Sequence, residues 1–304
     1  MLEACLLGTG GMLPLPKRYL TSLLLRYNGN NILIDCGEGT QMAIKESGWS
    51  PYPISLILIT HFHADHISGL PGLLLTLGNC ERKEPLIIAG PKGLKRVVDS
   101  LRVISPQLPY EIEYIEYNSN FVEFDHNNYH IKAFKVNHRV ECYGYTIEIK
   151  RRGKFNPIAA SELKIPNIYW RHLQNGDTVQ VGERCFKPEQ VMGSERKGLK
   201  VVYTTDTRPT KVIEEEAFEA DLFICEGMYG EDDKTSNAKK YKHMTMNEAA
   251  EIAAKANPKR LWLTHYSPAN VNPQRFEKKL KAIFDNTTIP EDGISIDLNF
   301  EDEE

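Results

Sequence analysis

Three histidines and an aspartate lie close together in the sequence, directly after an apolar run at positions 54–59. They are His61, His63, Asp65 and His66, in the pattern H-x-H-x-D-H. The apolar run predicts a buried strand, so the four residues follow at the point where that strand ends. His61 and His63 are two residues apart, and in an extended segment their side chains point the same way. Imidazole and carboxylate groups at this density are ligands that zinc and similar transition metals prefer, which a merely solvated turn would not require.

Further candidate ligands and proton carriers occur singly along the chain. His138, Asp206, Glu226 and His265 each stand at the end of an apolar stretch that predicts a strand, and His243 lies beside three lysines at positions 239, 240 and 242. A lone histidine at the end of a strand is more often an ordinary residue than a ligand. The ends of several strands can nevertheless meet at one edge of a sheet, and the long motif gives these single residues their significance.

Predicted strands and helices alternate through most of the chain. Strands are expected at 2–7, 22–27, 31–36, 54–59, 85–90, 110–117, 121–124, 129–136, 199–203, 221–228, 260–266 and 294–298, and helices at 67–78, 91–102, after Pro209, and at 247–256. Residues 150–200 are the least regular part. Because repeats, low-complexity stretches and clear boundaries are lacking in the sequence, we expect one domain over 1–304 with a substrate-binding insertion at 150–200.

The H-x-H-x-D-H motif after a hydrophobic strand resembles the signature of the metallo-β-lactamase superfamily. The resemblance implies an α/β fold, a four-layer αββα sandwich, with the metal site at one edge between the two sheets. The motif is specific for the superfamily but says little about the substrate.

A narrower resemblance covers essentially the whole chain. The segments Leu7–Gly10, Asp35–Gln41 and Gly69–Leu74 are similar, in sequence and in order, to those of the ribonuclease Z family of tRNA 3′-end endonucleases, in its short bacterial form. Glu226 matches the glutamate of the family's H-E-A-T motif, with Cys225 in place of the histidine. His243 matches the histidine of the family's H-S-T loop.

The resemblance implies a centre of two zinc ions, or of manganese or iron in the same places. One metal would be held by His61, His63 and His138, and the second by Asp65, His66 and His265, with Asp206 bridging them. Asp35 could orient a metal-bound histidine, and a simple loop aspartate is an equal alternative.

The implied reaction is hydrolysis of a phosphodiester by a metal-bound hydroxide, which would remove the 3′ trailer of precursor tRNA and leave 5′-phosphomonoesters. Asp65 would accept the proton of the attacking water. His243, oriented by Glu226, would protonate the leaving 3′-oxygen.

Four basic residues are candidates for substrate binding. Arg18 lies in a loop, Pro14–Tyr19, that matches the family's P-x-K-x-R-N loop at its proline and arginine but has Pro16 and Tyr19 for the lysine and asparagine. Lys150, Arg151 and Arg152 open the irregular region, where basic and aromatic residues interleave as they do in surfaces that contact phosphates and stack on bases. A solvated charged loop is an equal alternative for that region.

Composition narrows the class of protein. The chain has 304 residues, 41% hydrophobic and 26% charged, as in a soluble globular protein, and no apolar run approaches the ~20 residues of a membrane helix. The N-terminus lacks the basic start of a signal peptide, so we expect a cytoplasmic protein, and the family resemblance implies a homodimer. The net charge of −4 argues against bulk attraction to nucleic acid but not against a local basic patch.

Two alternatives to a precursor-tRNA nuclease remain at this stage. The same fold could act on a small phosphodiester or ester, such as a cyclic nucleotide, a thioester or a lactone. The altered loop keeps this alternative open, although Glu226, His243 and the basic flanks favour phosphate. A redox or non-catalytic member of the fold is the weaker alternative, because every ligand position of the motif is retained.

Overall fold

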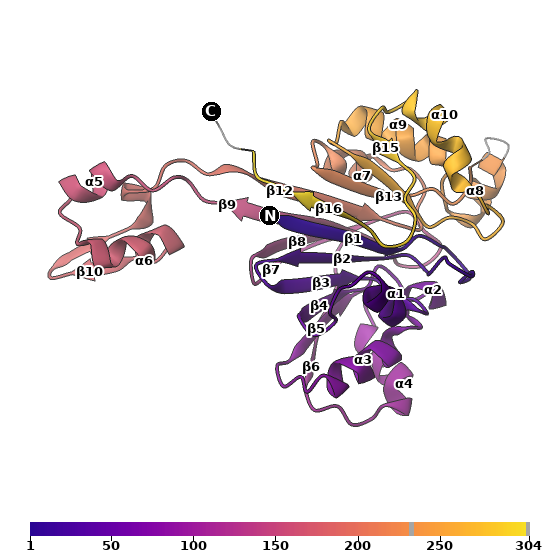
Figure 1. The fold of residues 1–304 in the computed structure, drawn as a ribbon, viewed down its shortest axis with the longest axis horizontal. Coiled ribbons are helices and arrows are strands. Elements are labelled where there is room, and N and C mark those ends of the chain that lie inside the picture. The colour runs from indigo at the N-terminus through magenta and orange to yellow at the C-terminus, as the bar shows by residue number, and fades with distance from the viewer. Residues whose placement is uncertain (231–233, 302–304) are drawn as a thin grey trace. The chain divides into compact units, whose positions relative to one another are not determined.

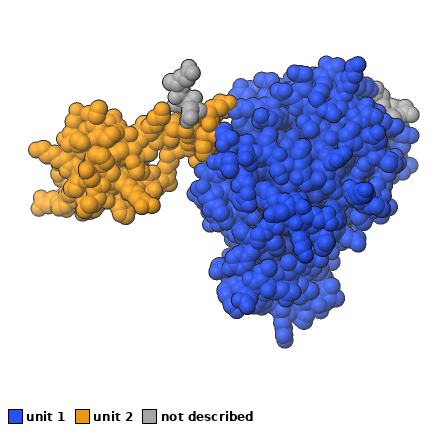
Figure 2. All heavy atoms as spheres, viewed as in Figure 1, with its two compact units in different colours: residues 1–148, 199–299 blue, residues 149–198, 300–304 orange. Residues whose placement is uncertain are grey.

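The computed structural model describes residues 1–230 and 234–301 (Figure 1). The chain divides into two compact units (Figure 2). The described part of unit 1 comprises residues 1–148, 199–230 and 234–299, and that of unit 2 comprises 149–198 and 300–301.

The first large sheet of unit 1 is built mainly from the N-terminal half of the chain. Its strands have the order β16-β1-β2-β3-β4-β5-β6, antiparallel from β16 to β3 and parallel from β3 to β6. The strands are β1 Leu2–Gly8, β2 Ser22–Tyr27, β3 Asn30–Ile34, β4 Ile54–Leu58, β5 Leu86–Gly90, β6 Ile112–Glu116 and β16 Ile294–Leu298. Helices α1 (Thr40–Glu46), α3 (Leu70–Asn79) and α4 (Leu94–Leu101) cover one face of it, and the short α2 (Ala64–Ile67) and η1 (Arg102–Ile104) complete this half.

The second large sheet has the order β15-β14-β13-β12-β9-β8-β7. Its strands are β7 Phe121–His126, β8 Tyr129–Lys135, β9 Tyr143–Arg151, β12 Arg196–Thr204, β13 Leu222–Glu226, β14 Leu261–Thr264 and β15 Thr287–Thr288. Helices α7 (Lys211–Ala217), α9 (Met246–Ala256) and α10 (Glu277–Lys281) pack on one face through a shared apolar cluster, with α8 (Thr235–Tyr241) and η5 (Pro273–Phe276) beside them.

The two sheets face each other and are joined by buried tyrosines. The Tyr145 hydroxyl donates to the Ile59 carbonyl at 2.7 Å, and the Tyr129 hydroxyl donates to the Asn30 carbonyl at 2.8 Å. Because each sheet is covered on both faces, β2, β4 and β13 are near-continuous apolar runs rather than alternating ones. The expected four-layer αββα sandwich is confirmed.

The structure corrects several of the predicted elements. Pro209 does not begin a helix, because Arg208 is bridged in extended form to Asn137 and α7 starts only at Lys211, after Thr210. The helix expected at 67–78 begins only at Leu70, as α3, because Ile67 ends the separate short helix α2. The helix expected from Pro91 begins at Leu94.

Strand β9, Tyr143–Arg151, was not predicted from the sequence. Its first five residues are all buried, as expected of a central strand, but its end extends into the region predicted as irregular. Lys150 and Arg151 therefore belong to a strand rather than to a loop.

Unit 2 has a small core of its own. It contains α5 (Pro157–Glu162), η2 (Asn167–Tyr169), α6 (Trp170–Asn175), the hairpin of β10 (Val179–Val181) and β11 (Arg184–Phe186), and η3 (Pro188–Gln190). Buried apolar residues from these elements form one cluster: Ala160, Ile165, Leu173, Val179, Phe186 and Val191. Within the described ranges, no helix is long and apolar enough to cross a membrane.

Candidate active site

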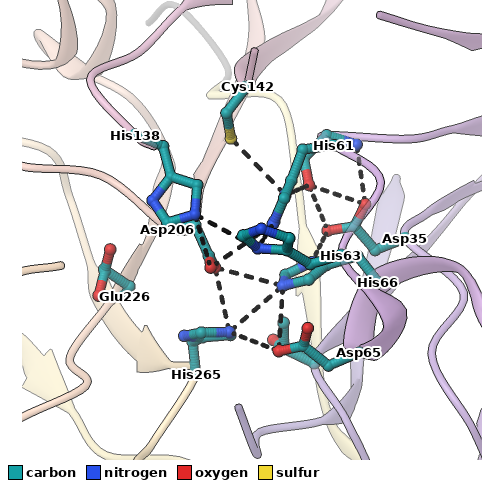
Figure 3. A network of polar contacts seen from close by, with 12 residues as sticks. Asp35, His61, His63, Asp65, His66, His138, Cys142, Asp206, Glu226 and His265 are labelled. Atoms are coloured by element: carbon teal, nitrogen blue, oxygen red, sulfur yellow. Dashed lines mark hydrogen bonds and ion pairs between the residues drawn. The ribbon is translucent and has the colours of Figure 1, made fainter. Parts of the chain in front are cut away.

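The ends of β4, β8, β12 and β14, together with helix α2, deliver the candidate ligands to one place in unit 1 (Figure 3). After β4 the backbone continues through His61 to His63, which is still extended at φ −67° and ψ 149° and precedes the first turn of α2. That turn carries Asp65 and His66, so one short segment supplies four side chains to the same site.

Asp206 and His265 share an unusual backbone conformation. Each stands just after a buried strand and has a left-handed backbone, with φ of 42° for Asp206 and 57° for His265. This conformation is costly for a residue with a side chain and concentrates at functional positions. Here it accompanies the turn at which each strand ends at the site.

The seven predicted ligands fall into two neighbouring groups. Within each group, one nitrogen or oxygen per residue lies within 4.8 Å of the others. The first group is His61, His63, His138 and Asp206, and the second is Asp65, His66 and His265. A third overlapping group joins Asp206 and His265 to His243.

Imidazole nitrogens of the first group lie close to one another. His61 Nε2 lies 2.9 Å from His63 Nδ1, and His138 Nε2 lies 3.4 Å from the same atom. Nitrogen ligands of a tetrahedral zinc ion, each at about 2.0–2.1 Å from the metal, stand roughly 3.3 Å apart. The spacing of the rings therefore fits a set of ligands around a cation.

Asp206 has one carboxylate oxygen toward each group. Oδ1 lies 3.0 Å from His265 Nε2 and 3.2 Å from His66 Nε2, whereas Oδ2 lies 3.6 Å from Nε2 of both His61 and His138. Oδ1 is buried and accepts no hydrogen bond within the described residues. A buried anionic oxygen left in this way is costly unless a cation or proton is shared with it, so this residue also fits a metal centre.

Hydrogen bonds at Nδ1 determine which ring nitrogen His66 and His138 direct toward the site. Asp35 accepts from His66 Nδ1 at 2.8 Å and from the backbone N–H of Thr60 at 2.9 Å. His138 Nδ1 donates to the Lys242 carbonyl at 3.1 Å. Both rings therefore present Nε2 to the site, which is how metal-binding histidines are usually oriented.

Asp65 is held from a second side by the backbone of Met12, whose N–H donates to Oδ2 at 2.7 Å. Burial alone would raise the pKa of Asp65, but hydrogen bonds from His265 and His66 outweigh it and hold that pKa well below its usual range. Asp65 is therefore a carboxylate at neutral pH.

Glu226 and His243 lie beside the ligand groups as a hydrogen-bonded pair. His243 Nδ1 donates to Glu226 Oε2 at 3.2 Å, and Glu226 also accepts from the backbone N–H of Met244 at 3.2 Å and of Thr207 at Oε1. Burial disfavours the charged ring, but the carboxylates of Glu226, Asp206 and Asp65 prevail and raise the pKa of His243 to about 9. His243 Nδ1 thus lies next to the candidate metal ligands, 3.9 Å from Asp206 Oδ2.

The predicted substrate-binding residues are not part of this cluster. The Arg18 guanidinium donates hydrogen bonds to the carbonyls of Asn270 and Val271, each at 2.8 Å. Lys150, Arg151 and Arg152 all belong to unit 2.

Contacts within unit 2 engage two of these three residues. Arg151 donates to the Glu301 carbonyl at 2.7 Å and lies over the Phe300 ring, and Arg152 donates to the Gln174 carbonyl at 3.0 Å.

Three residues near the site were missed from the sequence. Met12 acts through its backbone and Lys242 through its carbonyl, and a sequence pattern carries no signal for either contact. Arg208 could have been noticed two positions after Asp206, but its partners lie 35 and 40 residues away.

Comparisons with known proteins place this fold and site. The family model described as anti-Pycsar protein Apyc1 matches residues 2–287. Proteins named ribonuclease Z from Lachnospira eligens and Agathobacter rectalis are 56% and 55% identical to the chain over 303 residues, covering 100% of it and of themselves. The crystal structure of human tRNase Z, short form, aligns with a TM-score of 0.70 and 25% identity over 98% of this chain and 100% of that one.

The fold and the cluster of ligand side chains define a metal-dependent hydrolase with the metallo-β-lactamase fold. Full-length identity above one half to the named relatives makes the assignment more specific. The chain belongs to the ribonuclease Z family, and it also matches the Apyc1 model over nearly all of its length. It is an endoribonuclease of that family.

Proposed function

We propose that the chain cleaves precursor tRNA on the 3′ side of the acceptor stem and releases the trailer with a 5′-phosphate. One observation carries the proposal: the seven candidate ligand side chains form two groups connected by Asp206, and they lie beside the His243–Glu226 pair. A metal site alone would suit many hydrolyses, but an imidazole beside it, oriented by a carboxylate so that it can give up a proton, suits a substrate with a poor leaving group. The names of the relatives, ribonuclease Z and tRNase Z, support tRNA as that substrate.

The residues fit two divalent ions. One ion would be held by His61, His63 and His138 and the other by Asp65, His66 and His265, with Asp206 between them. Nitrogen-rich ligands favour zinc, and manganese or iron suits the same set. Bound there, the ions would supply a water of lowered pKa and positive charge near the reacting phosphate.

The chain's own side chains carry the protons. Asp65, an ionised carboxylate fixed by the Met12 amide, accepts the proton of the attacking water. His243 Nδ1 is engaged by Glu226, so Nε2 is the atom from which a proton passes to the leaving 3′-oxygen. General acid help of this kind is worth ~10²–10⁴-fold in rate.

Substrate binding is proposed for Arg18 and for Lys150, Arg151 and Arg152, with residues 150–200 as an insertion that contacts RNA. The exposed basic side chains of unit 2 and its independent core support this role, because an RNA-contacting element needs positive charge on a defined scaffold. Arg18 would act chiefly by holding its loop against residues 270–271.

The active form proposed is a cytoplasmic homodimer. This follows the family resemblance, and light scattering tests it by the mass in solution, expected at twice the 34.6 kDa of one chain. A mass of one chain at micromolar concentration would contradict it.

A small phosphodiester, such as a cyclic nucleotide, is the second candidate substrate. The observation that favours it is the Pro14–Tyr19 loop, where Pro16 replaces a basic residue and Arg18 is already engaged by backbone carbonyls.

A comparison of rates on three substrates separates the two candidate functions. The zinc-loaded protein is given a precursor tRNA, a 3′,5′-cyclic nucleotide and bis-p-nitrophenyl phosphate, and kcat/KM is measured for each. A preference for the precursor of several orders of magnitude supports the proposal. Turnover of the cyclic nucleotide or the small diester without cleavage of the precursor moves the assignment to the second candidate.

A further inference from the structure

The peptide that follows His243 is held by charged groups at both of its polar atoms. Arg208 Nη1 donates to the His243 carbonyl at 2.6 Å, and Glu226 Oε2 accepts the N–H of Met244 at 3.2 Å. The peptide that follows the imidazole is therefore fixed at both its carbonyl and its N–H. The segment 242–245, here called the His243 turn, also contains Lys242, whose backbone is left-handed at φ 62°.

Arg208 is itself fixed by Glu248. Nη1 lies 2.9 Å from Glu248 Oε2, and Nη2 donates to Oε1, so the guanidinium and the carboxylate form a two-bond pair. Their side chains are only 13% and 19% exposed. A paired arrangement of this kind, mostly withdrawn from water, is stronger and better oriented than a surface ion pair.

Glu248 has a second task at the start of α9. Its carboxylate accepts the N–H of Thr245 at 2.9 Å, while the Thr245 hydroxyl accepts the N–H of Glu248 at 3.2 Å. Burial would raise the pKa of Glu248, but Arg208 and the Thr245 amide lower it, which keeps the carboxylate charged. The pair thus ties the His243 turn to the rigid first turn of a buried helix.

Arg208 also connects this turn to the ligand side of the site. Its backbone N–H donates to the Asn137 carbonyl at 3.1 Å, next to the ligand His138. It lies two residues after Asp206. Arg208 therefore connects the two parts of the site: its guanidinium contacts the His243 turn, and its backbone lies close to Asp206. It can hold the position of the turn relative to the carboxylate.

We propose that Arg208, held by Glu248, is a positioning residue for His243, and that it acts on the protonation of the leaving oxygen rather than on metal binding. The inference rests on the proposed function of His243 as proton donor. A general acid must be within about 2.6–3.2 Å of the atom it protonates, and a displacement of about 1 Å can cost ~10²-fold in rate. Without the Arg208 guanidinium, the carbonyl of the residue that must be placed with this accuracy is free to move.

Comparing substrates whose leaving groups differ in basicity separates a role in proton transfer from a merely structural role. Only a role in proton transfer would slow the substrates unequally. The 3′-oxygen of a nucleoside leaves poorly without a proton, whereas p-nitrophenolate spreads its charge over the ring and leaves without one. We therefore measure kcat and KM for precursor tRNA, for thymidylyl-(3′,5′)-thymidine and for bis-p-nitrophenyl phosphate, together with zinc content and Tm. The variants are Arg208→Lys, His243→Ala and the double variant, with Lys211→Ala as the matched control in an exposed ion pair three residues further on.

For Arg208→Lys we expect kcat to fall about 10²-fold on the two substrates with a nucleoside leaving group, at the lower end of the range for general-acid help. KM, zinc content and the rate on bis-p-nitrophenyl phosphate should stay near those of the wild type. The double variant should be no slower than His243→Ala, because a residue that acts only through His243 has nothing left to position. The Lys211→Ala control should match the wild type throughout.

Three results would overturn the inference: an equal loss on all substrates, a loss of zinc in Arg208→Lys, or multiplicative losses in the double variant. The proposed function can fail separately. Cleavage of the dinucleoside but not of precursor tRNA would refute the tRNA assignment and leave the role of Arg208 standing on its own data. A wild-type protein that hydrolyses only the p-nitrophenyl ester would contradict both.

Discussion

At the scale of single residues, Asp206 is the point at which the site is joined. Its two oxygens face different groups of histidines, and its strained backbone turns the chain between β12 and the loop that carries Arg208. The sequence motif H-x-H-x-D-H identified four candidate ligands by spacing alone. The remaining three depended on resemblance, because a single His or Asp after a strand carries little information without its neighbours in space.

Asp65→Ala should reduce cleavage of a phosphodiester by more than ~10³-fold, since proton transfer alone contributes roughly 10²–10⁴-fold and a ligand is lost as well. Kinetics and metal analysis on the same preparation test this, with less zinc expected than in the wild type. Asp99→Ala, in an exposed ion pair with Lys95, serves as the control. Substantial cleavage by Asp65→Ala with full zinc content would contradict the assignment.

His243→Ala should slow RNA cleavage by ~10²–10⁴-fold while both metals remain bound, because Nδ1 serves Glu226 and the ring is not needed to complete either ligand group. Single-turnover rates and zinc content give the answer. If the variant lost its metals, the third group of Asp206, His243 and His265 would have to be counted as a ligand set and the donor role abandoned.

At the scale of elements, the hydrophobic runs predicted most strands well, because a sheet covered on both faces needs continuous apolar residues. Where a local signal was absent, the predictions failed. The start of α7 depends on the pairing of Arg208 with Asn137, 71 positions earlier in the chain, and not on Pro209. Contacts such as Met12 with Asp65, and Arg208 with His243, depend on the tertiary fold and are beyond any local pattern.

The glycine-rich loop after β1 gives a prediction at this scale. A Cβ at Gly11 would lie 2.7–2.8 Å from ring atoms of His265, closer than side chains tolerate. Gly11→Ala should therefore displace His265, lower the affinity for the second metal and cost about 1–3 kcal/mol in unfolding free energy. Denaturation and zinc titration measure both effects.

Gly72→Ala is the matched control, because its Cβ would meet only the end of the flexible Gln41 side chain. Wild-type zinc affinity in Gly11→Ala would mean that the loop moves aside freely and does not define the position of His265.

At the scale of the whole molecule, unit 1 contains all seven candidate ligands and unit 2 contains a core of its own. The general sandwich was predictable from the motif, but the separate core of unit 2 was not. Its apolar residues are spread thinly among charged ones, so neither a helical nor a strand period stands out. We propose that unit 1 carries out the hydrolysis and that unit 2 contacts the RNA.

Substituting Lys150, Arg151 and Arg152 together by alanine should weaken RNA binding and flatten its dependence on salt, by roughly 0.7–0.9 in the logarithmic slope for each phosphate that is no longer neutralised. Binding titrations at several salt concentrations provide the slope. Because Arg151 and Arg152 also bond to backbone carbonyls of unit 2, the fold of the variant must be checked by circular dichroism. An unchanged slope in a folded variant would remove these residues from the RNA-binding surface.

The central claim is tested most directly by mapping where the zinc-loaded protein cuts a precursor tRNA labelled at both ends. We predict a single cut beside the acceptor stem, with a 3′-hydroxyl on the tRNA, a 5′-phosphate on an intact trailer, and no cut by Asp65→Ala. Stepwise shortening of the trailer from its 3′ end, or an intact precursor under conditions in which bis-p-nitrophenyl phosphate is hydrolysed, would contradict it.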